Sequence, residues 1–206
     1  MNEITAITPQ IKDKTRCNVY VDGRFCCGLK VETVVKNRLK VGVAVTEEQL
    51  SAMQLESEKM AALDKALCFI SASRKTEKDV RAYLQKKGYL SAVSDHVVEK
   101  MKGYGYIDDN EYAKEYAQSA AKKKGKRLVA LELKRKGVCD DAIDIAVDEM
   151  DGEDETARRL AEKYMRGKTA TPETVQKAYR HLLSKGFDFD VAKAAVQKVC
   201  GVEDDE

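Results

Sequence analysis

From about residue 56 onward, apolar residues recur at spacings of three and four, which is the period of an amphipathic α-helix. Leu63, Ala66, Leu67 and Ile70 mark the first such stripe. Glycines follow several of these segments, as they do at the C-terminal ends of helices. The pattern therefore predicts a series of short helices in this part of the chain.

One phrase occurs three times in the helical region, with its glycine at positions 88, 137 and 186. In each copy a leucine stands four residues before the glycine, a lysine directly before it and an apolar residue directly after it. Because the glycines are 49 residues apart in both intervals, we predict tandem copies of one structural unit.

Each copy has room for three helices. We predict helices from about 56 to 70, from 76 to Gly88 and over 92–101 in the first copy, over 111–121, 127–136 and 141–150 in the second, and over 155–165, 172–185 and 191–199 in the third. Thr76 with Asp79 forms a capping-box pattern, and Thr171 precedes Pro172, a favoured first helical residue. Helices this short are marginal alone, so each unit must pack internally and on its neighbours.

The N-terminal region has a different pattern. Residues 4–8, 17–21 and 24–29 favour β-structure, and Asp22-Gly23 between the last two suits a tight turn. We predict a small hairpin or three-stranded sheet, then short helices over 31–37 and 46–55. Such a small sheet is marginal alone, so we expect it to pack on a helix or a partner.

The predicted fold is mainly α-helical: a tandem array of three three-helix, helix-turn-helix-like repeats, preceded by a small N-terminal β-hairpin domain. The predicted divisions are the hairpin with its short helices over 1–55, repeats over 56–105, 106–152 and 153–202, and an acidic tail over 203–206.

Composition agrees with a helical protein. Charged residues make up 35% of the 206 residues and aromatic residues 6%, with no tryptophan and two prolines. No apolar run approaches the roughly 20 residues that span a bilayer, and the N-terminus lacks a signal-peptide pattern, so we expect a cytoplasmic protein without membrane contact. Six cysteines without a C-x-x-C motif, and only two histidines, indicate reduced structural thiols and neither metal nor cofactor.

The net charge of +2 conceals a strong segregation of charge along the chain. Between Lys114 and Gly137 there are nine basic residues and two acids, whereas between Asp140 and Glu155 there are nine acids and no base. The distribution of charge is therefore more informative than its sum.

The strongest candidate for binding is the turn between the first two helices of the middle repeat. Its cations are Lys122, Lys123, Lys124, Lys126 and Arg127. We expect the amides of the following helix N-terminus to point outward there, so that lysines and free N–H groups together bind phosphate. A solvated lysine-rich loop is the alternative, but cations are unfavourable at a helix N-terminus and need another explanation.

Other basic residues extend this candidate surface. Arg74, Lys75, Lys78 and Arg81 occupy the equivalent place in the first repeat, so the two patches are predicted to line one continuous surface. The third repeat lacks an equivalent patch. Lys134 and Arg135 lie in the last turn of a helix, where they either stabilise the helix dipole or belong to a shared basic ridge.

Tyrosines cluster where the first two repeats meet, at positions 104, 106, 112 and 116. They are candidates for base stacking, but the spacing of Tyr112 and Tyr116 favours a core role. No nucleotide-binding, metalloprotease or nucleophile–histidine motif is present, so we predict that the chain is not an enzyme.

Three segments resemble the RecX family of regulators of the RecA recombinase. They read Ser73-Arg74-Lys75-Thr76-Glu77-Lys78-Asp79-Val80-Arg81 with Leu84 and Lys87-Gly88-Tyr89, then Gly105-Tyr106-Ile107-Asp108-Asp109 with Tyr112-Ala113, then Gly125-Lys126-Arg127 with Glu132-Leu133 and Lys136-Gly137-Val138. The match covers about residues 60–150 well and the third repeat loosely. Lys75-Thr76 replaces the usual Arg-Ser and keeps both the charge and the hydroxyl.

The resemblance implies a tandem of three-helix units that binds along the RecA–single-stranded DNA filament without catalysing a reaction. Such a protein promotes filament disassembly or blocks extension, and so limits recombination during DNA repair. The implied partners are the RecA filament and single-stranded DNA, or duplex DNA without sequence specificity, and we expect a monomer.

Two other functions stay open. A helix-turn-helix transcription factor would read duplex DNA, although the acidic segment 141–150 is poorly suited to a DNA groove. A scaffold whose lysines are only solubilising would bind nucleic acid weakly and without salt dependence.

Overall fold

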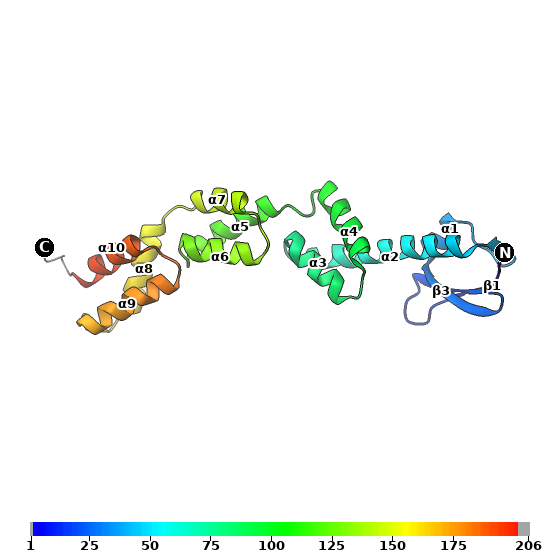
Figure 1. The fold of residues 1–206 in the computed structure, drawn as a ribbon. Coiled ribbons are helices and arrows are strands. Elements are labelled where there is room, and N and C mark those ends of the chain that lie inside the picture. Colours follow the sequence, from blue (N-terminus) through cyan, green and yellow to red (C-terminus); the bar gives the residue numbers. More distant parts are fainter. Residues whose placement is uncertain (1, 202–206) are drawn as a thin grey trace. The chain divides into compact units, whose positions relative to one another are not determined.

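The computed structural model describes residues 2–201, which form four strands and ten helices (Figure 1). In chain order these are β1 (Asn2–Pro9), β2 (Arg16–Val21), β3 (Arg24–Lys30), α1 (Val31–Lys36), β4 (Ala44–Val45), α2 (Glu47–Ile70), α3 (Glu77–Lys86), α4 (Ser91–Gly103), α5 (Asp109–Ala121), α6 (Lys126–Arg135), α7 (Asp140–Asp148), α8 (Glu153–Met165), α9 (Pro172–Ser184) and α10 (Phe189–Cys200). The predicted fold class is confirmed. The predicted acidic tail, 203–206, lies outside the described residues.

The chain divides into two compact units. One holds the described residues up to Arg74 together with Asp79–Ile107, and the other holds Lys75–Lys78 and the described residues from Asp108 onward. Buried side chains form four separate cores: one under the sheet, one within α2–α4, one within α5–α7 and one within α8–α10. Each three-helix repeat therefore encloses its own apolar interior.

The N-terminal sheet has four antiparallel strands in the order β3-β2-β1-β4. Asp22 and Gly23 have φ values of +49° and +76°, which are the left-handed values that a two-residue hairpin requires. The predicted turn is confirmed, but β4 was not predicted because its two residues carry no alternation.

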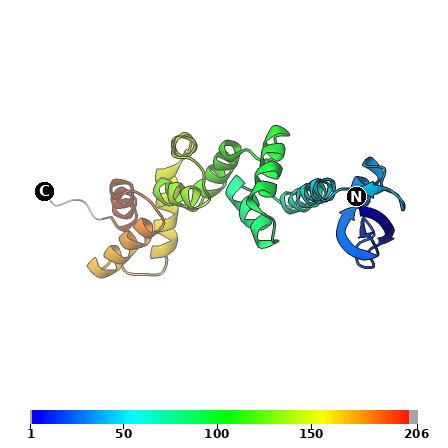
Figure 2. The same ribbon diagram turned by 45° about the vertical axis from the view of Figure 1, so that its right-hand side comes forward.

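Helix α2 is a single helix of 24 residues, and the predicted break near residue 55 is wrong. The segment contains neither glycine nor proline, so nothing stops the helix, which Thr46 and Gln49 open with a capping box. Its first half covers the sheet, where Ser57 Oγ accepts the amide of Lys30 at 2.7 Å. Figure 2 shows α2, in cyan, running between the blue N-terminal sheet and the green helices of the first repeat. Its second half supplies Ala62 and Ala66 to the core of the first repeat, so the predicted boundary between 55 and 56 falls inside a helix.

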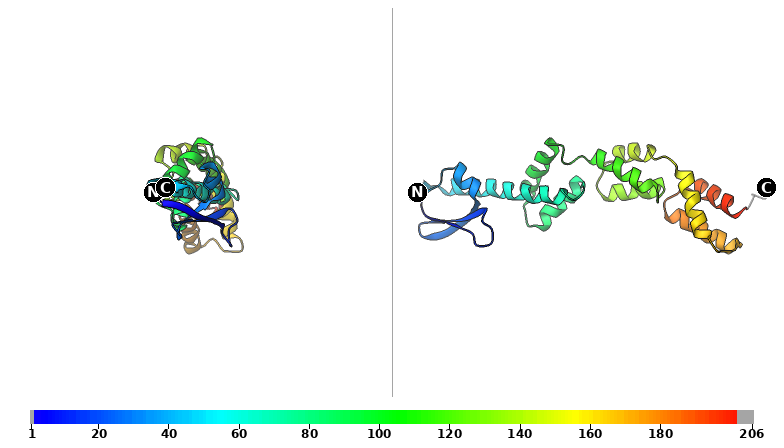
Figure 3. Two further views of the ribbon diagram at one scale, coloured as in Figure 1. Left: turned by 90° about the vertical axis from the view of Figure 1, so that its right-hand side faces the viewer. Right: turned by 180° about the vertical axis from the view of Figure 1, so that it is seen from behind.

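The helices of the second and third repeats lie within one or two residues of their predicted positions. Figure 3 shows α5–α7 and α8–α10 as separate three-helix groups. Thr171 caps α9 with Pro172 at its start, as predicted, and Asp108 caps α5 by accepting the amides of Asn110 and Glu111.

The recurring phrase forms the same turn in all three repeats. Gly88, Gly137 and Gly186 have φ values of 86°, 85° and 86°. The residue after each glycine donates its amide to the carbonyl of the leucine four positions before the glycine, at 3.2 or 3.3 Å. This is the Schellman ending of a helix, in which the buried leucine and the apolar residue after the glycine close the turn together. We call the three copies the glycine turns.

The second and third glycine turns also bind the start of a helix. In the third, Lys185 O accepts the amide of Gly125 at 2.9 Å and Gly186 O accepts the amide of Arg127 at 3.2 Å. In the second, Lys136 O accepts Thr76 Oγ1 at 2.9 Å and Arg135 O accepts Lys78 Nζ at 2.8 Å.

An acid near the start of the following repeat completes each contact. Glu153 Oε1 accepts the amide of Lys126, and Asp109 Oδ1 accepts the amide of Glu77, both at 2.9 Å. Both carboxylates therefore lie at a helix N-terminus, where the dipole favours negative charge. The two contacts lie within the second unit, and Gly125 and Lys185 of one contact stand 49 residues after Thr76 and Lys136 of the other.

Glycine is required in the third turn for a second reason. A Cβ atom at residue 186 would overlap the backbone nitrogen and Cβ of Leu128, and one at residue 125 would overlap the carbonyl of Gly186. Gly167, in the same repeat, also has a positive φ of 73°, but a Cβ atom there would meet nothing within 4 Å.

These two glycines give a matched test. We expect Gly167→Ala to lower the free energy of unfolding by about 1–2 kcal/mol, the cost of a left-handed non-glycine residue. We expect Gly186→Ala to lower it by about 3–5 kcal/mol, since backbone must also move. Urea denaturation of both variants measures the difference, and equal losses would show that the contact contributes nothing.

Candidate nucleic-acid interface

The basic turn between α5 and α6 contains cations in very different surroundings. Lys122 is the C-cap of α5 and Gly125 is the N-cap of α6, so residues 122–125 form the whole connection between the two helices. Lys122 and Lys123 are exposed, whereas Lys124 and Lys126 are half-buried. The stretch is therefore not a uniform basic loop.

The amides at the start of α6 do not point into solvent, and this part of the prediction is wrong. Gly125, Lys126 and Arg127 donate their N–H groups to Lys185 O, Glu153 Oε1 and Gly186 O. The third glycine turn and Glu153 accept the amides that were predicted to bind phosphate. Sequence alone could not show this, because the acceptors lie 27 to 60 residues further along the chain.

Lys124 belongs to an internal network. Its Nζ lies 2.6 and 2.7 Å from the two carboxylate oxygens of Glu132 and 3.2 Å from the hydroxyl of Tyr116, which itself donates to Glu132 at 2.6 Å. The hydrogen bond that Lys124 donates to Glu132 raises the pKa of Lys124. Burial raises the pKa of Glu132, but its bonds from Lys124 and Tyr116 outweigh this and lower the pKa overall. The charge of Lys124 is neutralised in place.

The other predicted cations of the second repeat divide in the same way. Arg127 Nη1 lies 3.4 Å from Asp188, and Lys134 Nζ lies 3.0 Å from Asp140. By contrast, Lys122, Lys123 and the side chains of Lys126 and Arg135 form no ion pair with any described residue. These four are the cations that the turn and its neighbouring helix can offer to an anion.

The predicted patch of the first repeat is also divided. Arg81 forms an ion pair with Asp95 of α4, within the first unit. Lys78 belongs to the second unit, where its ammonium group binds Arg135 O and its stem lies beside Gly137. Arg74 is exposed and Lys75 is half-buried. The continuous surface over both patches stays a prediction.

The tyrosine cluster separates into core and surface. Tyr112 and Tyr116 stack with ring centroids 6.1 Å apart and planes 10° apart, against the core of the second repeat. Their predicted core role is confirmed. Tyr104 and Tyr106 are 60% and 52% exposed and meet edge to face.

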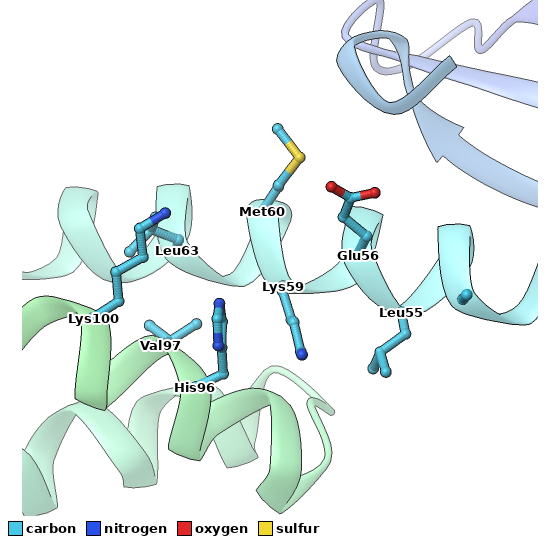
Figure 4. A pocket seen from close by; sticks show the side chains of 9 residues that line it. Leu55, Glu56, Lys59, Met60, Leu63, His96, Val97 and Lys100 are labelled. Carbon is cyan, nitrogen blue, oxygen red and sulfur yellow. The ribbon is translucent and has the colours of Figure 1, made fainter. Parts of the chain in front are cut away.

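A small pocket in the first unit, which was not predicted, brings together the basic side chains of Lys59, His96 and Lys100. A cavity of about 370 Å³ lies between α2 and α4. In Figure 4, Lys59 points from α2 toward α4, while His96 and Lys100 point from α4 toward α2. The spacing of His96 and Lys100 by one helical turn was the available signal, but only the pairing of helices brings Lys59 to them.

No cluster of three or more histidine, cysteine or acidic side chains forms a metal site in residues 2–201. Burial, with a smaller effect of Cys26, raises the pKa of Cys27 to about 12, so that thiol stays protonated at neutral pH. No helix in this part of the chain is both long and apolar enough to cross a membrane.

Two adjacent lysines test whether the paired and unpaired cations of the basic turn contribute differently to stability. We expect Lys124→Ala to lower the free energy of unfolding by about 1–2 kcal/mol, because it leaves the half-buried Glu132 carboxylate without its cation. We expect Lys123→Ala to change it by less than about 0.5 kcal/mol, because nothing in the fold uses that charge. Thermal and urea denaturation measure both; a larger loss at Lys123 contradicts the division.

Comparison with known proteins comes to the same family that the motifs resemble. Four family models match in chain order: the regulatory protein RecX N-terminal domain over residues 2–46, and the first, second and third RecX three-helix domains over 62–101, 108–147 and 151–196. Regulatory protein RecX of Clostridium beijerinckii is 31% identical, with 100% of both chains covered. That of Bacillus licheniformis is 32% identical over 100% of this chain and 80% of its own.

Solved structures agree with these relatives. The crystal structure of a regulatory protein RecX has a TM-score of 0.72 and 26% identity, covering 98% of this chain and 100% of its own. RecX from Lactobacillus salivarius has a TM-score of 0.63 and 22% identity over 71% of this chain and 99% of its own, and so shares the fold. Because its relatives match along the whole chain and all four domain models match in chain order, this chain belongs to the RecX family of regulatory proteins.

Proposed function

We propose that this chain is a non-enzymatic regulator, mainly an inhibitor, of the RecA recombinase, which binds along the RecA filament on single-stranded DNA. Membership of the RecX family and the motif resemblance support this proposal. The observation that carries it is the group of cations in the α5–α6 turn and on α6, Lys122, Lys123, Lys126 and Arg135, which form no ion pair with any described residue. Charges that the fold does not use are available to DNA phosphates or to an acidic filament surface.

The proposed action is binding rather than chemistry. A filament that carries this protein would lose access to DNA or to the next recombinase subunit, and ATP hydrolysis, strand exchange and co-protease action would fall together. The tandem repeats suit a polymeric partner, because each repeat presents equivalent positions at a fixed interval. We propose that the protein acts as a cytoplasmic monomer without a cofactor.

A sequence-reading transcription factor has less support. The third helix of a helix-turn-helix unit must enter the major groove beside phosphates. In the second repeat this helix is α7, which carries Asp140, Asp141, Asp144 and Asp148. Four carboxylates on nine residues would repel the DNA backbone. A footprint on duplex DNA separates the two functions, because discrete protected sites would favour a transcription factor.

The DNA-dependent ATPase of the cognate RecA measures the proposed function directly. We expect turnover to fall as the protein is added to filaments on single-stranded DNA, with a clear loss at equimolar amounts. We expect Lys122→Glu/Lys123→Glu to need at least about ten times more protein, since two phosphate contacts become repulsive. Unchanged turnover with the wild-type protein would overturn the proposal.

A control variant separates this site from net charge. Arg158→Glu/Lys198→Glu changes the charge equally at exposed residues of α8 and α10. We expect this control to inhibit as the wild type does. A control that fails equally would mean that total charge, and not the α5–α6 turn, governs inhibition.

A further inference from the structure

A second cationic site lies in the third repeat, although the start of α9 lacks the basic patch found at the equivalent place in the first two repeats. A cavity of about 600 Å³ in the second unit lies where three helices end: α5 at Ala121, α8 at Met165 and α9 at Ser184. Its basic lining residues are Lys123, Lys163, Arg166, Lys168, His181 and Lys185. The volume is in the range of small-molecule and nucleotide sites.

No acidic side chain lines this cavity. None of its lysines, nor Arg166, forms an ion pair with any acid among residues 2–201, unlike Lys124 and Arg127 nearby. Permanent positive charges gathered without carboxylates repel one another, and this arrangement lowers stability unless an anion joins them.

Helix dipoles do not account for all of this charge. Cations are favoured at helix C-termini, and three helices end at the cavity. Three ends supply about one and a half negative elementary charges together, and only when fully aligned. The four lysines and Arg166 carry five positive charges, so the helix ends offset less than half of this charge.

Two stacked rings form part of the lining of the cavity. The rings of Tyr164 and His181 stack with centroids 4.9 Å apart and planes 24° apart, and Lys168 Nζ lies 3.5 Å above the Tyr164 ring. Burial, and then the charges of Lys185 and Lys168, lower the pKa of His181, so its imidazole is neutral at neutral pH. A bound anion would favour its protonated form.

The cations come from two repeats. Lys123 comes from the α5–α6 turn and adjoins Lys122 of the candidate interface, while the others come from the ends of α8 and α9. The cavity gathers five permanent cations from two repeats, more positive charge than the one or two negative charges of a single phosphate can neutralise. This excess suits successive phosphates of a chain more than one isolated ion.

We propose that this cavity binds the phosphodiester backbone of single-stranded nucleic acid and continues the path that begins at Lys122 and Lys123. The inference deepens the proposed function, since the strand would be the DNA of the filament, but binding to the strand requires no recombinase. The third repeat would thus contact DNA through the C-terminal ends of its helices, while the start of α9 takes no part.

Fluorescence anisotropy with a labelled oligothymidylate, in the absence of recombinase, tests the site. We expect Lys163→Glu/Arg166→Glu to weaken binding at least about tenfold and to reduce the single-strand salt slope by about 1.4, the value for two phosphate contacts. The charge-matched control Arg158→Glu/Lys198→Glu should stay within about twofold of wild type. A milder variant, Lys163→Gln/Arg166→Gln, provides the same test if charge reversal unfolds the repeat.

Competition distinguishes a strand from a free nucleotide. We expect unlabelled oligothymidylate to displace the probe and thymidine monophosphate to do so only at far higher concentration. Equal potency of the two would overturn the assignment to a strand, as would wild-type affinity in both Lys163/Arg166 variants. If RecA turnover is unaffected while these oligonucleotide results hold, the proposed function fails and the cavity assignment stands.

Protonation gives an independent readout. His181 faces Tyr164 and Lys168 on one side of the cavity and Lys185 on its own helix, with the other cavity cations around them. We expect oligothymidylate binding to tighten as the pH falls from about 7.5 to about 6, since bound phosphate favours the imidazolium ion. His181→Gln should remove that dependence, and a dependence that persists unchanged would contradict phosphate contact at this residue.

Discussion

The arrangement of the second unit depends on one backbone conformation: the left-handed glycine that ends the second helix of a repeat. This residue closes the Schellman turn over a buried leucine and turns the last carbonyls of the helix outward. In the second and third glycine turns those carbonyls receive the start of another helix. One glycine therefore ends a helix and creates a docking surface at the same time.

This contact is polar, while the interior of each repeat is apolar. The cores of α5–α7 and α8–α10 are separate, and the hydrogen bonds of Gly125, Lys126 and Arg127 connect the two repeats. Hydrogen bonds are directional, so they set the register between repeats more sharply than apolar contact would. The acid at the start of the next repeat, Glu153, adds a charge at the helix N-terminus, where the dipole favours it.

The same contact explains which cations the fold consumes. Lys78 binds a carbonyl of the second glycine turn, and Lys124 is neutralised by Glu132. Lys122, Lys123 and the cavity cations of the third repeat are not used in this way. A count of lysines along the chain treats these groups alike, although only the second group is available to a partner.

Local features of the fold could be predicted from the sequence, and long-range ones could not. The 49-residue register, the capping residues Thr46 and Thr171, and the left-handed Gly88 follow from interactions within a few residues. The acceptors of the α6 amides could not be foreseen, because Lys185 and Glu153 reach them through folding. The cavity of the third repeat was missed for the same reason: its cations are dispersed in the chain and converge only where three helices end.

Helix α2 has a consequence for how the N-terminal part of the chain gains and loses its structure. The same uninterrupted helix contributes Leu50 to the core under the sheet and Ala62 and Ala66 to the core of the first repeat. A helix propagates order along its own axis, so melting at one end is transmitted to the other. The sheet and the first repeat should therefore unfold cooperatively, as a single foldon. Transplanting the sheet to another protein would require carrying the whole of α2 with it.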